Sequence, residues 1–221
     1  MIDCRISDTY TKILQYELQE ATGCTEPIAL ALAGAKTRAV LGGMPEEADV
    51  YCSGNIIKNV KGVVVPNSGG KRGIDTAVIL GMVAGDENAG LQVIHKASDQ
   101  DREKMKEYLQ KTKIRCHLAQ DVPTLYIRIE ARNAENSALV EIQVTHSNVT
   151  RIVRNGEVVL QSESGKDEYP GPDKSLLNVR DIIEYAQSVD VKDIQDVIER
   201  QIADNTAISQ EGLKNPWREE V

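Results

Sequence analysis

The sequence contains no phenylalanine and a single tryptophan, and aromatic side chains account for only 4% of its 221 residues. The hydrophobic core must therefore be built from aliphatic side chains, and the hydrophobic fraction of 41% is ordinary for a soluble globular protein. A chain of this length forms one large domain or two small ones.

Apolar runs of membrane-spanning length are also absent from the sequence, since a spanning helix needs roughly 20 consecutive apolar residues. The segment Met1–Ile6 already carries charged side chains where a secretory signal would need an apolar run. These two absences predict a cytoplasmic protein with no membrane partner.

Positive charge is in deficit, because the net charge is −8 at pH 7 and residues 161–221 carry most of the acidic excess. Nucleic acids are bound through basic surfaces that neutralise phosphates, so we expect no nucleic-acid partner. An acidic segment of this kind usually indicates a solvated helical surface and sometimes a surface for a partner protein.

Cys-x-x-Cys pairs are missing too, although the chain has four cysteines, at positions 4, 24, 52 and 116. Structural zinc and thioredoxin-like chemistry therefore lack support. Structural disulfides are not expected in a reducing cytoplasm. Each cysteine has to be judged by its own surroundings.

The first part of the chain is expected to be largely helical. Apolar residues at helical spacing predict an amphipathic helix over residues 8–20. A second helix follows Gly23, with Thr25 as a cap and Pro27 in the first turn, where no N–H is needed. Residues 28–35 are apolar nearly all round, which predicts a buried helix.

The middle of the chain mixes strand and helix signals. A strand is expected over residues 48–53, followed by an irregular segment at 54–59. A short extended run at 63–65 leads into a glycine-rich loop at 67–73, which opens a helix. A charged helix is expected over residues 99–111.

From about residue 114 the apolar pattern changes to a period of two, which predicts half-buried strands. Asn155-Gly156 joins the last two strands in a hairpin. Residues 161–175 are interpreted as a linker, and two helices with apolar stripes end the chain.

The predicted fold class is therefore α+β. It comprises N-terminal helices that include one buried helix, a mainly antiparallel sheet around residues 114–160, and two C-terminal helices. The predicted domains are an α+β domain over residues 1–160 and a helical segment over residues 176–221.

Cys24 is the most suggestive side chain, because it directly precedes the N-terminus of the buried helix. The helix dipole and free N–H groups there favour negative charge and are expected to lower the pKa of the thiol. A thiolate binds metals, yet a small buried residue in a helix-entering turn is the simpler interpretation. Glu26 complements the same dipole, and a role in proton transfer is a further option.

Other polar groups point to chemistry less specifically. The glycine-rich loop can bind a carboxylate or phosphate through backbone N–H groups, although it lacks P-loop spacing and many such turns bind nothing. Asn55, Lys58 and Asn59 suit either a turn or a polar substrate. His146 ends a strand, where it is either a proton-transfer residue or merely exposed.

The order of these segments resembles the L-cysteine desulfidase family, also described as L-serine dehydratase alpha-chain-like iron–sulfur lyases. The most specific segment is Gly-Cys-Thr-Glu-Pro at residues 23–27. Weaker motifs extend the resemblance over nearly the whole chain: Ser53–Asn59, Val65-Pro66 with the glycine loop, Asn88–Leu91, His146-Ser147-Asn148 and Ile208–Leu213.

The resemblance implies a pyridoxal-independent lyase that uses a [4Fe–4S] cluster to eliminate the β-substituent of L-cysteine or L-serine. The products are pyruvate, ammonia, and sulfide or water. Cys24 matches the first cluster-ligating cysteine of the family. We assign His146 and Glu26 to catalysis. The residues expected to bind the amino-acid substrate are Thr25, Asn55, Lys58, Asn59, Ser68, Gly69 and Gly70.

Two features depart from the family pattern. Lys71-Arg72 stands where the family loop has glycine, threonine and apolar residues, which bears on substrate identity. The family proteins are also considerably longer, and their second half carries the other cluster cysteines, which the remaining cysteines of this chain do not match. We therefore expect an incomplete enzyme that needs a C-terminal half or second subunit, with no cluster on this chain alone.

Exposed apolar surface on such a chain further predicts a homo-oligomer. Two alternatives from other classes remain: a stand-alone amino-acid or anion-binding module, and an inactive remnant of the enzyme.

Overall fold

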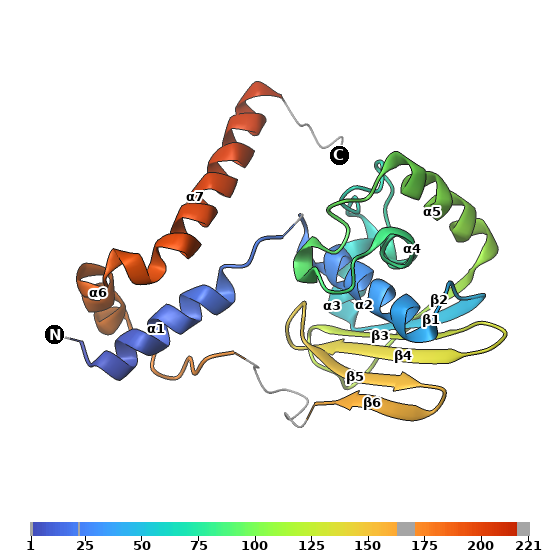
Figure 1. The fold of residues 1–221 in the computed structure, drawn as a ribbon, viewed down its shortest axis with the longest axis horizontal. Coiled ribbons are helices and arrows are strands. Elements are labelled where there is room, and N and C mark those ends of the chain that lie inside the picture. Colours follow the sequence, from blue (N-terminus) through green and yellow to red (C-terminus); the bar gives the residue numbers. More distant parts are fainter. Residues whose placement is uncertain (1, 22, 163–170, 216–221) are drawn as a thin grey trace. The chain divides into compact units, whose positions relative to one another are not determined.

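The computed structural model describes residues 2–21, 23–162 and 171–215. The chain divides into two units, an α+β unit of Ala21–Pro170 and a helical unit that joins Met1–Glu20 to Gly171–Val221. Figure 1 shows the elements of both units along the chain. The α+β class predicted from the sequence is confirmed.

Four α-helices and a six-stranded sheet make up the described part of the α+β unit. The helices are α2 (Thr25–Leu41), α3 (Gly54–Lys61), α4 (Ile74–Ala84) and α5 (Asp99–Lys111), with a short 3-10 turn η1 (Gly90–Gln92). The strands are β1 (Glu47–Cys52), β2 (Lys113–Leu118), β3 (Tyr126–Arg132), β4 (Ser137–Gln143), β5 (Val149–Arg154) and β6 (Glu157–Gln161).

The strand order is β2-β1-β3-β4-β5-β6, so β1 lies inside a sheet whose other strands come much later in the sequence. β1 runs parallel to β2, and every other neighbouring pair is antiparallel. The predicted hairpin between β5 and β6 is confirmed, with Asn155 and Gly156 both at positive φ (50° and 84°). Two such residues suit the tight turn that joins twisted strands.

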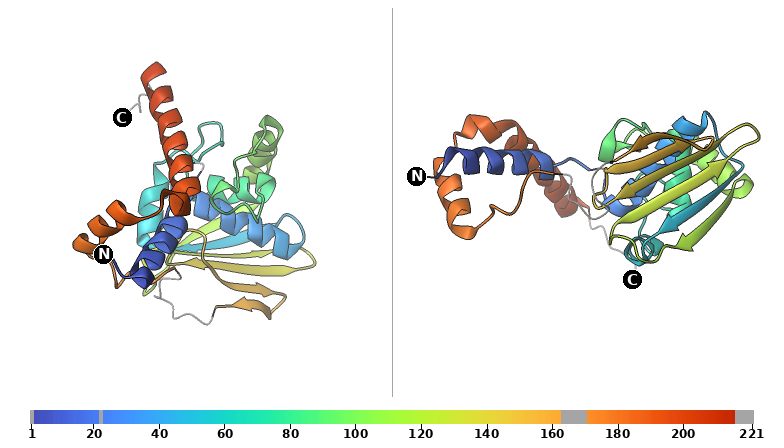
Figure 2. Two further views of the ribbon diagram at one scale, coloured as in Figure 1. Left: turned by 60° about the vertical axis from the view of Figure 1, so that its left-hand side comes forward. Right: turned by 90° about the horizontal axis from the view of Figure 1, so that it is seen from below.

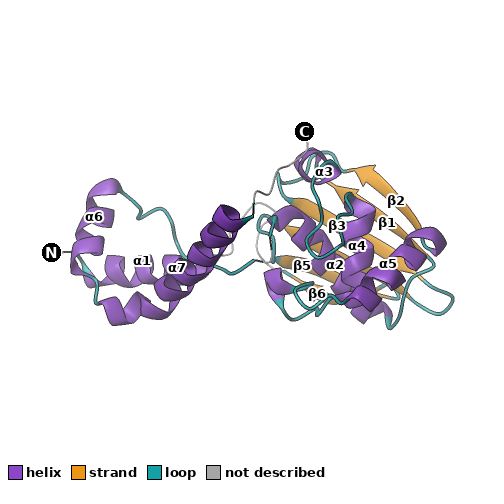
Figure 3. Cartoon of the chain, turned by 90° about the horizontal axis from the view of Figure 1, so that it is seen from above, coloured by secondary structure: helices purple, strands orange, loops and turns teal. Residues whose placement is uncertain are grey.

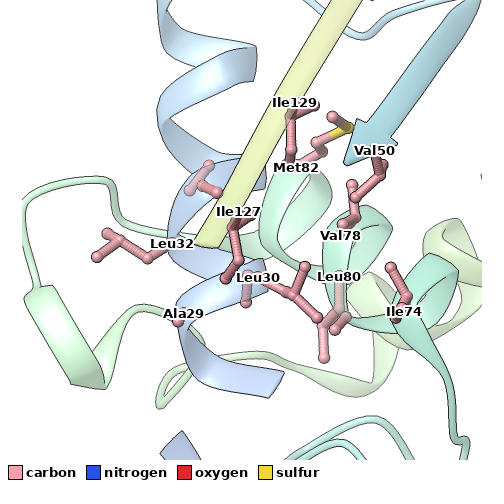
Figure 4. Packing of buried hydrophobic residues seen from close by; sticks show 14 of the residues in the cluster. Ala29, Leu30, Leu32, Val50, Ile74, Val78, Leu80, Met82, Ile127 and Ile129 are labelled. Atoms are coloured by element: carbon pink, nitrogen blue, oxygen red, sulfur yellow. The ribbon is translucent and has the colours of Figure 1, made fainter. Parts of the chain in front are cut away.

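Helices α2 and α4 form the layer that buries one face of the sheet (Figure 3). The α2 segment 27–35 is buried throughout, which confirms the predicted buried helix. Figure 4 shows its side chains packed with those of α4 and with the inward-facing residues Val50, Ile127 and Ile129 in one cluster. The core is aliphatic, as the lack of phenylalanine requires.

The two helices approach each other at glycines. A methyl group added at Gly81 would lie 2.0 Å from the carbonyl oxygen of Ala31, and one added at Gly34 would lie 2.5 Å from that of Val78. Real Cβ atoms are not found at such distances, so both positions require glycine if this helix spacing is kept.

The other face of the sheet carries charged and aromatic side chains, because alternate residues of each strand point away from the helices. Figure 2 (right) views the α+β unit from below, with its strands in the foreground. Asp49 accepts hydrogen bonds from Arg115 (2.5 and 2.7 Å) and contacts His117 (2.6 Å). The ring of Tyr51 stacks on His117 at 4.7 Å and lies under the Arg128 guanidinium at 4.1 Å.

This cluster gives a pH-dependent prediction. Hydrogen bonds from Arg115 keep the pKa of Asp49 far below its ordinary value. A depressed carboxyl pKa stabilises the folded state above the unfolded-state pKa, and this contribution is lost as the pH falls. We expect Asp49→Asn to lower the free energy of unfolding by about 1 kcal/mol at pH 7, after allowance for solvent screening. At pH 3 the loss should be smaller. Thermal unfolding of the parent protein and the variant between these pH values measures the difference. The control is Glu103→Gln, which removes an exposed ion pair with Lys106 and should leave the stability unchanged at every pH.

The helical unit contains α1 (Cys4–Glu17), α6 (Val179–Ser188) and α7 (Val191–Lys214). Its small core centres on Tyr10, Ile13 and Tyr185. The two tyrosine rings meet edge to face at 5.5 Å, and the Tyr10 hydroxyl donates to the carbonyl of Leu176 at 2.8 Å. Among the described residues, every helix is too short or too polar to span a bilayer.

Several sequence-based boundaries need correction. The segment 54–59, predicted to be irregular, is the helix α3, because the Ser53 side chain caps its first turn. The first helix begins at Cys4 rather than residue 8, since Asp3 accepts a hydrogen bond from Arg5 N–H. That helix packs with α6 and α7, whereas the sequence analysis placed it in the domain of residues 1–160. Residues 163–170 of the predicted linker lie outside the described residues.

Candidate functional site

The candidate site is built around the N-terminus of α2. Cys24 is the cap residue of this helix, its side chain makes no capping hydrogen bond, and the residue is exposed. The thiol instead donates to Glu26 Oε2 at 3.3 Å, and Thr25 Oγ1 donates to the same oxygen at 3.4 Å. One carboxylate oxygen therefore faces both the thiol and the hydroxyl.

The other oxygen of Glu26 accepts a hydrogen bond from Asn59 Nδ2 at 3.0 Å. Asn59 lies on α3, whose N-cap Ser53 directly follows β1 and donates through its hydroxyl to the carbonyl of Thr124 at 2.6 Å. The Glu26 carboxylate thus joins residues 23–27 to residues 53–59 by hydrogen bonds. The sequence had suggested these two segments only separately.

His146 lies in the turn between β4 and β5, and its charge interacts with that of Glu26. Gln143 N–H donates to Asn148 O at 3.1 Å, and Asn148 Nδ2 returns a hydrogen bond to Gln143 O at 3.0 Å. Inside this turn Val144 has φ 69°, and Thr145 N–H donates to Gln143 O at 2.8 Å. A β-branched residue in such a three-residue turn is strained, so the surrounding bonds must hold it.

Glu26 and His146 interact electrostatically, and each influences the pKa of the other. Burial lowers the pKa of the half-buried His146 and the charge of Glu26 partly opposes this, so the imidazole is neutral at pH 7. Burial alone would raise the pKa of Glu26. Hydrogen bonds from its own N–H, Cys24 and Asn59, together with His146, lower it overall. At pH 7 the site holds a carboxylate beside a neutral imidazole, which can accept a proton.

The expectation that the α2 dipole lowers the pKa of Cys24 is wrong. Partial burial raises the pKa of this thiol, and the hydrogen bond to Glu26 and its negative charge raise it further. The thiol is therefore protonated at pH 7, with a hydrogen-bond acceptor already in place for its proton.

Gly23 brings the glycine-rich loop toward the site. A methyl group at Gly23 would lie 2.8 Å from Pro66 Cγ, so the chain segment before Cys24 packs directly on the residue that opens the loop. Sequence reasoning missed this contact, although both residues belong to the motifs that carry the family resemblance. Asn148 was also missed as the residue that closes the His146 turn.

The other residues predicted to bind the substrate lie on α3 and in the glycine-rich loop. Asn55 and Lys58 are exposed on α3, and Gly69 and Gly70 are exposed with φ of 73° and 86°. Ser68 is buried, and its hydroxyl exchanges hydrogen bonds with the backbone of Lys71 at 2.9 Å. Their role in substrate binding stays a prediction.

The N-terminus of α4 after the glycine loop already has an acidic partner. The carboxylate of Asp75 accepts a hydrogen bond from the N–H of Thr76 at 2.8 Å, and its Oδ1 lies against Gly73. A bound anion at this helix end would meet that carboxylate.

Curated relatives match nearly all of this chain but only part of themselves. A UPF0597 protein of Finegoldia magna is 44% identical over 94% of this chain and 50% of its own length. UPF0597 protein FN1147 of Fusobacterium nucleatum is 41% identical over 93% of this chain and 49% of its own length. A UPF0597 protein of Treponema denticola is 34% identical over 95% of this chain and 49% of its own length. The chain thus spans about half the length of the relatives it matches.

No family model matches the chain. No solved structure matches it either.

The Cys24–Glu26 contact gives a test of the site geometry. We expect Glu26→Gln to speed alkylation of Cys24 by iodoacetamide at pH 8 by about three-fold, because loss of the charge lowers the thiol pKa while a less basic thiolate is also less nucleophilic. Peptide mass spectrometry gives the rate, with the exposed Cys4 as internal reference. Glu103→Gln should leave the Cys24 rate unchanged, and an unchanged rate in Glu26→Gln would show that the contact is not formed in solution.

Proposed function

We propose that this chain forms one half of an iron–sulfur amino-acid lyase that eliminates the β-substituent of L-cysteine or L-serine. The observation that carries the proposal is the convergence of Cys24, Glu26, Asn59 and His146 from three separate segments. These four residues come from the sequence motifs that resemble the lyase family. A reducing cytoplasmic location is part of the proposal, since exposed thiols persist there.

Cys24 fits the role of one cluster ligand, because its sulfur is exposed and lies at a helix N-terminus. Among the described residues no group of three Cys, His, Asp or Glu side chains is placed to hold a metal ion. The other ligands would therefore come from a second polypeptide half. A [4Fe–4S] cluster, when bound, supplies an open iron that acts as a Lewis acid on the substrate's thiol or hydroxyl.

The protein residues would handle the proton and the substrate. His146, neutral at pH 7, would accept the α-proton, and the Glu26 carboxylate would stabilise the imidazolium that forms. Asn59 holds Glu26 in position at 3.0 Å. Departure of sulfide or water from Cβ leaves an enamine, which hydrolyses to pyruvate and ammonia.

Exposed apolar side chains support the need for a second half or second copy. Seven of them lie on the last two helices of the described chain: Val179, Ile182, Ile183, Val191, Ile202, Ile208 and Leu213. Where exposed apolar side chains form a contiguous patch, that patch usually marks a surface that another protein covers. We therefore also expect self-association of this chain when it is expressed alone.

The decisive experiment pairs this chain with the C-terminal half of the Finegoldia magna relative. Both are co-expressed, purified without oxygen and supplied with iron and sulfide. We expect bound iron and inorganic sulfide, and release of pyruvate from L-cysteine or L-serine. Cys24→Ala should lose both the iron and the activity, whereas Cys4→Ala should keep them. A stable complex that binds no iron and consumes neither amino acid contradicts the proposal.

A metal-free binding module is the second candidate, supported by the exposed, glycine-rich turn at Gly69-Gly70. It predicts that L-serine, L-cysteine or phosphate raises the melting temperature of this chain alone without iron. Such a shift, combined with absence of iron in the paired complex, would favour this candidate over the lyase.

A further inference from the structure

Two cysteines that the proposed function does not use lie side by side in the sheet. Cys52 ends β1 and Cys116 lies in the neighbouring parallel strand β2. The register pairs Cys52 with Leu118 and Cys116 with Val50. Because side chains alternate along a strand, residues 116 and 118 share a face, and that face is the one of Cys52. The two thiols are therefore diagonal neighbours.

The two thiols also influence each other electrostatically, since each is the largest cause of the other's pKa shift. Cys52 is fully buried against the helix layer, whereas Cys116 is exposed on β2, the edge strand of the sheet. The pair thus combines an exposed residue on the edge strand with a buried residue on the next strand and on the same face of the sheet. This arrangement differs from that of an isolated surface thiol such as Cys4.

The pair favours a single negative charge on the exposed sulfur. The hydrogen bond from Cys52 lowers the pKa of Cys116 to about 7, helped by His117 and opposed by burial and by Asp75 at the start of α4. The same bond raises the pKa of Cys52, because its proton is shared with the neighbouring thiolate. One proton leaves easily and the second is retained.

We propose that Cys116 is an oxidant-sensitive thiol and that Cys52 is the resolving thiol which converts its oxidation product into an intramolecular disulfide. The oxidant class is a peroxide. The site is separate from Cys24 and its partners, so the inference does not depend on the lyase proposal.

The chemistry balances in two steps. The Cys116 thiolate attacks one oxygen of hydrogen peroxide, the O–O bond breaks, and the sulfur becomes a sulfenic acid while water is released. The Cys52 sulfur then attacks the sulfenic sulfur, the S–O bond breaks, and a second water leaves with the thiol proton. Two thiols are oxidised and one peroxide is reduced to two waters.

The test uses the full chain, reduced and then treated with hydrogen peroxide at pH 7. We expect a mass loss of two hydrogen atoms and a Cys52–Cys116 crosslink in the peptide map. Cys116→Ser abolishes the crosslink. Cys52→Ser should leave a sulfenic acid on Cys116 that dimedone traps, and Cys4→Ser should change nothing.

A second readout does not require the disulfide to form. We expect Cys52→Ala to slow alkylation of Cys116 by iodoacetamide at pH 7 by about three-fold, because the thiolate loses its hydrogen-bond donor while its intrinsic nucleophilicity rises only partly in compensation. Circular dichroism checks that the variant is folded. Equal peroxide reactivity of Cys116 and Cys4, or an alkylation rate that Cys52→Ala leaves unchanged, overturns the proposal.

Discussion

Gly81→Ala is expected to destabilise the α+β unit by about 3 kcal/mol, which corresponds to a fall in melting temperature of roughly 6–12 °C. The added methyl group would lie 2.0 Å from the Ala31 carbonyl oxygen, in the backbone of a helix that cannot rotate out of the way. Alanine is the better helix former by about 1 kcal/mol, so any loss of stability has to come from the packing.

A matched control lies in the other unit. Gly212 is also helical, in α7, and a methyl group there meets no atom within 4 Å. Gly212→Ala should therefore be neutral or stabilise by up to about 1 kcal/mol. Thermal unfolding followed by circular dichroism compares the two variants. If Gly81→Ala proved as stable as the parent protein, the close approach of α2 and α4 would be wrong.

Local patterns predicted the elements of this fold but not all of their partners. The period-two segments and the Asn155-Gly156 turn predicted the β3–β6 strands, because alternation and turn chemistry are local properties. The insertion of β1 between β2 and β3 is set by contacts far apart in sequence, and no local signal reports it. The glycines of the α2–α4 contact did not predict this helix pairing either. The reason for a glycine inside a helix becomes clear only when the backbone that faces it is known.

The candidate site shows the same division. Cys24, Glu26, Asn59 and His146 were all named from the sequence, but their hydrogen bonds and mutual charges depend on three segments meeting. The sign of the Cys24 pKa shift was wrong because the helix position was weighed without the partial burial of the thiol and without the carboxylate two residues later. A helix dipole acts weakly on an exposed end, and burial together with a carboxylate in direct contact outweighs it.

Glu26→Gln is expected to lower kcat of the iron-loaded complex by about 10²-fold or more, and His146→Asn by a similar factor, the range found for loss of a general base. This prediction rests on the proposed lyase function. The two residues act as a pair, because the Glu26 carboxylate raises the pKa of His146 against the effect of burial. Asn59→Ala, which leaves the carboxylate in place, should cost less.

The pH profile separates a chemical role of Glu26 from a structural one. If His146 is the base, the acidic limb of kcat/KM reports its pKa, and Glu26→Gln should move that limb to lower pH, since the opposing charge is removed. Glu103→Gln should leave the limb unchanged. The double variant Glu26→Gln/His146→Asn should be little slower than either single variant, because a carboxylate that acts through the imidazole has no effect once the imidazole is absent. Fully additive losses with an unshifted acidic limb would assign Glu26 a separate role.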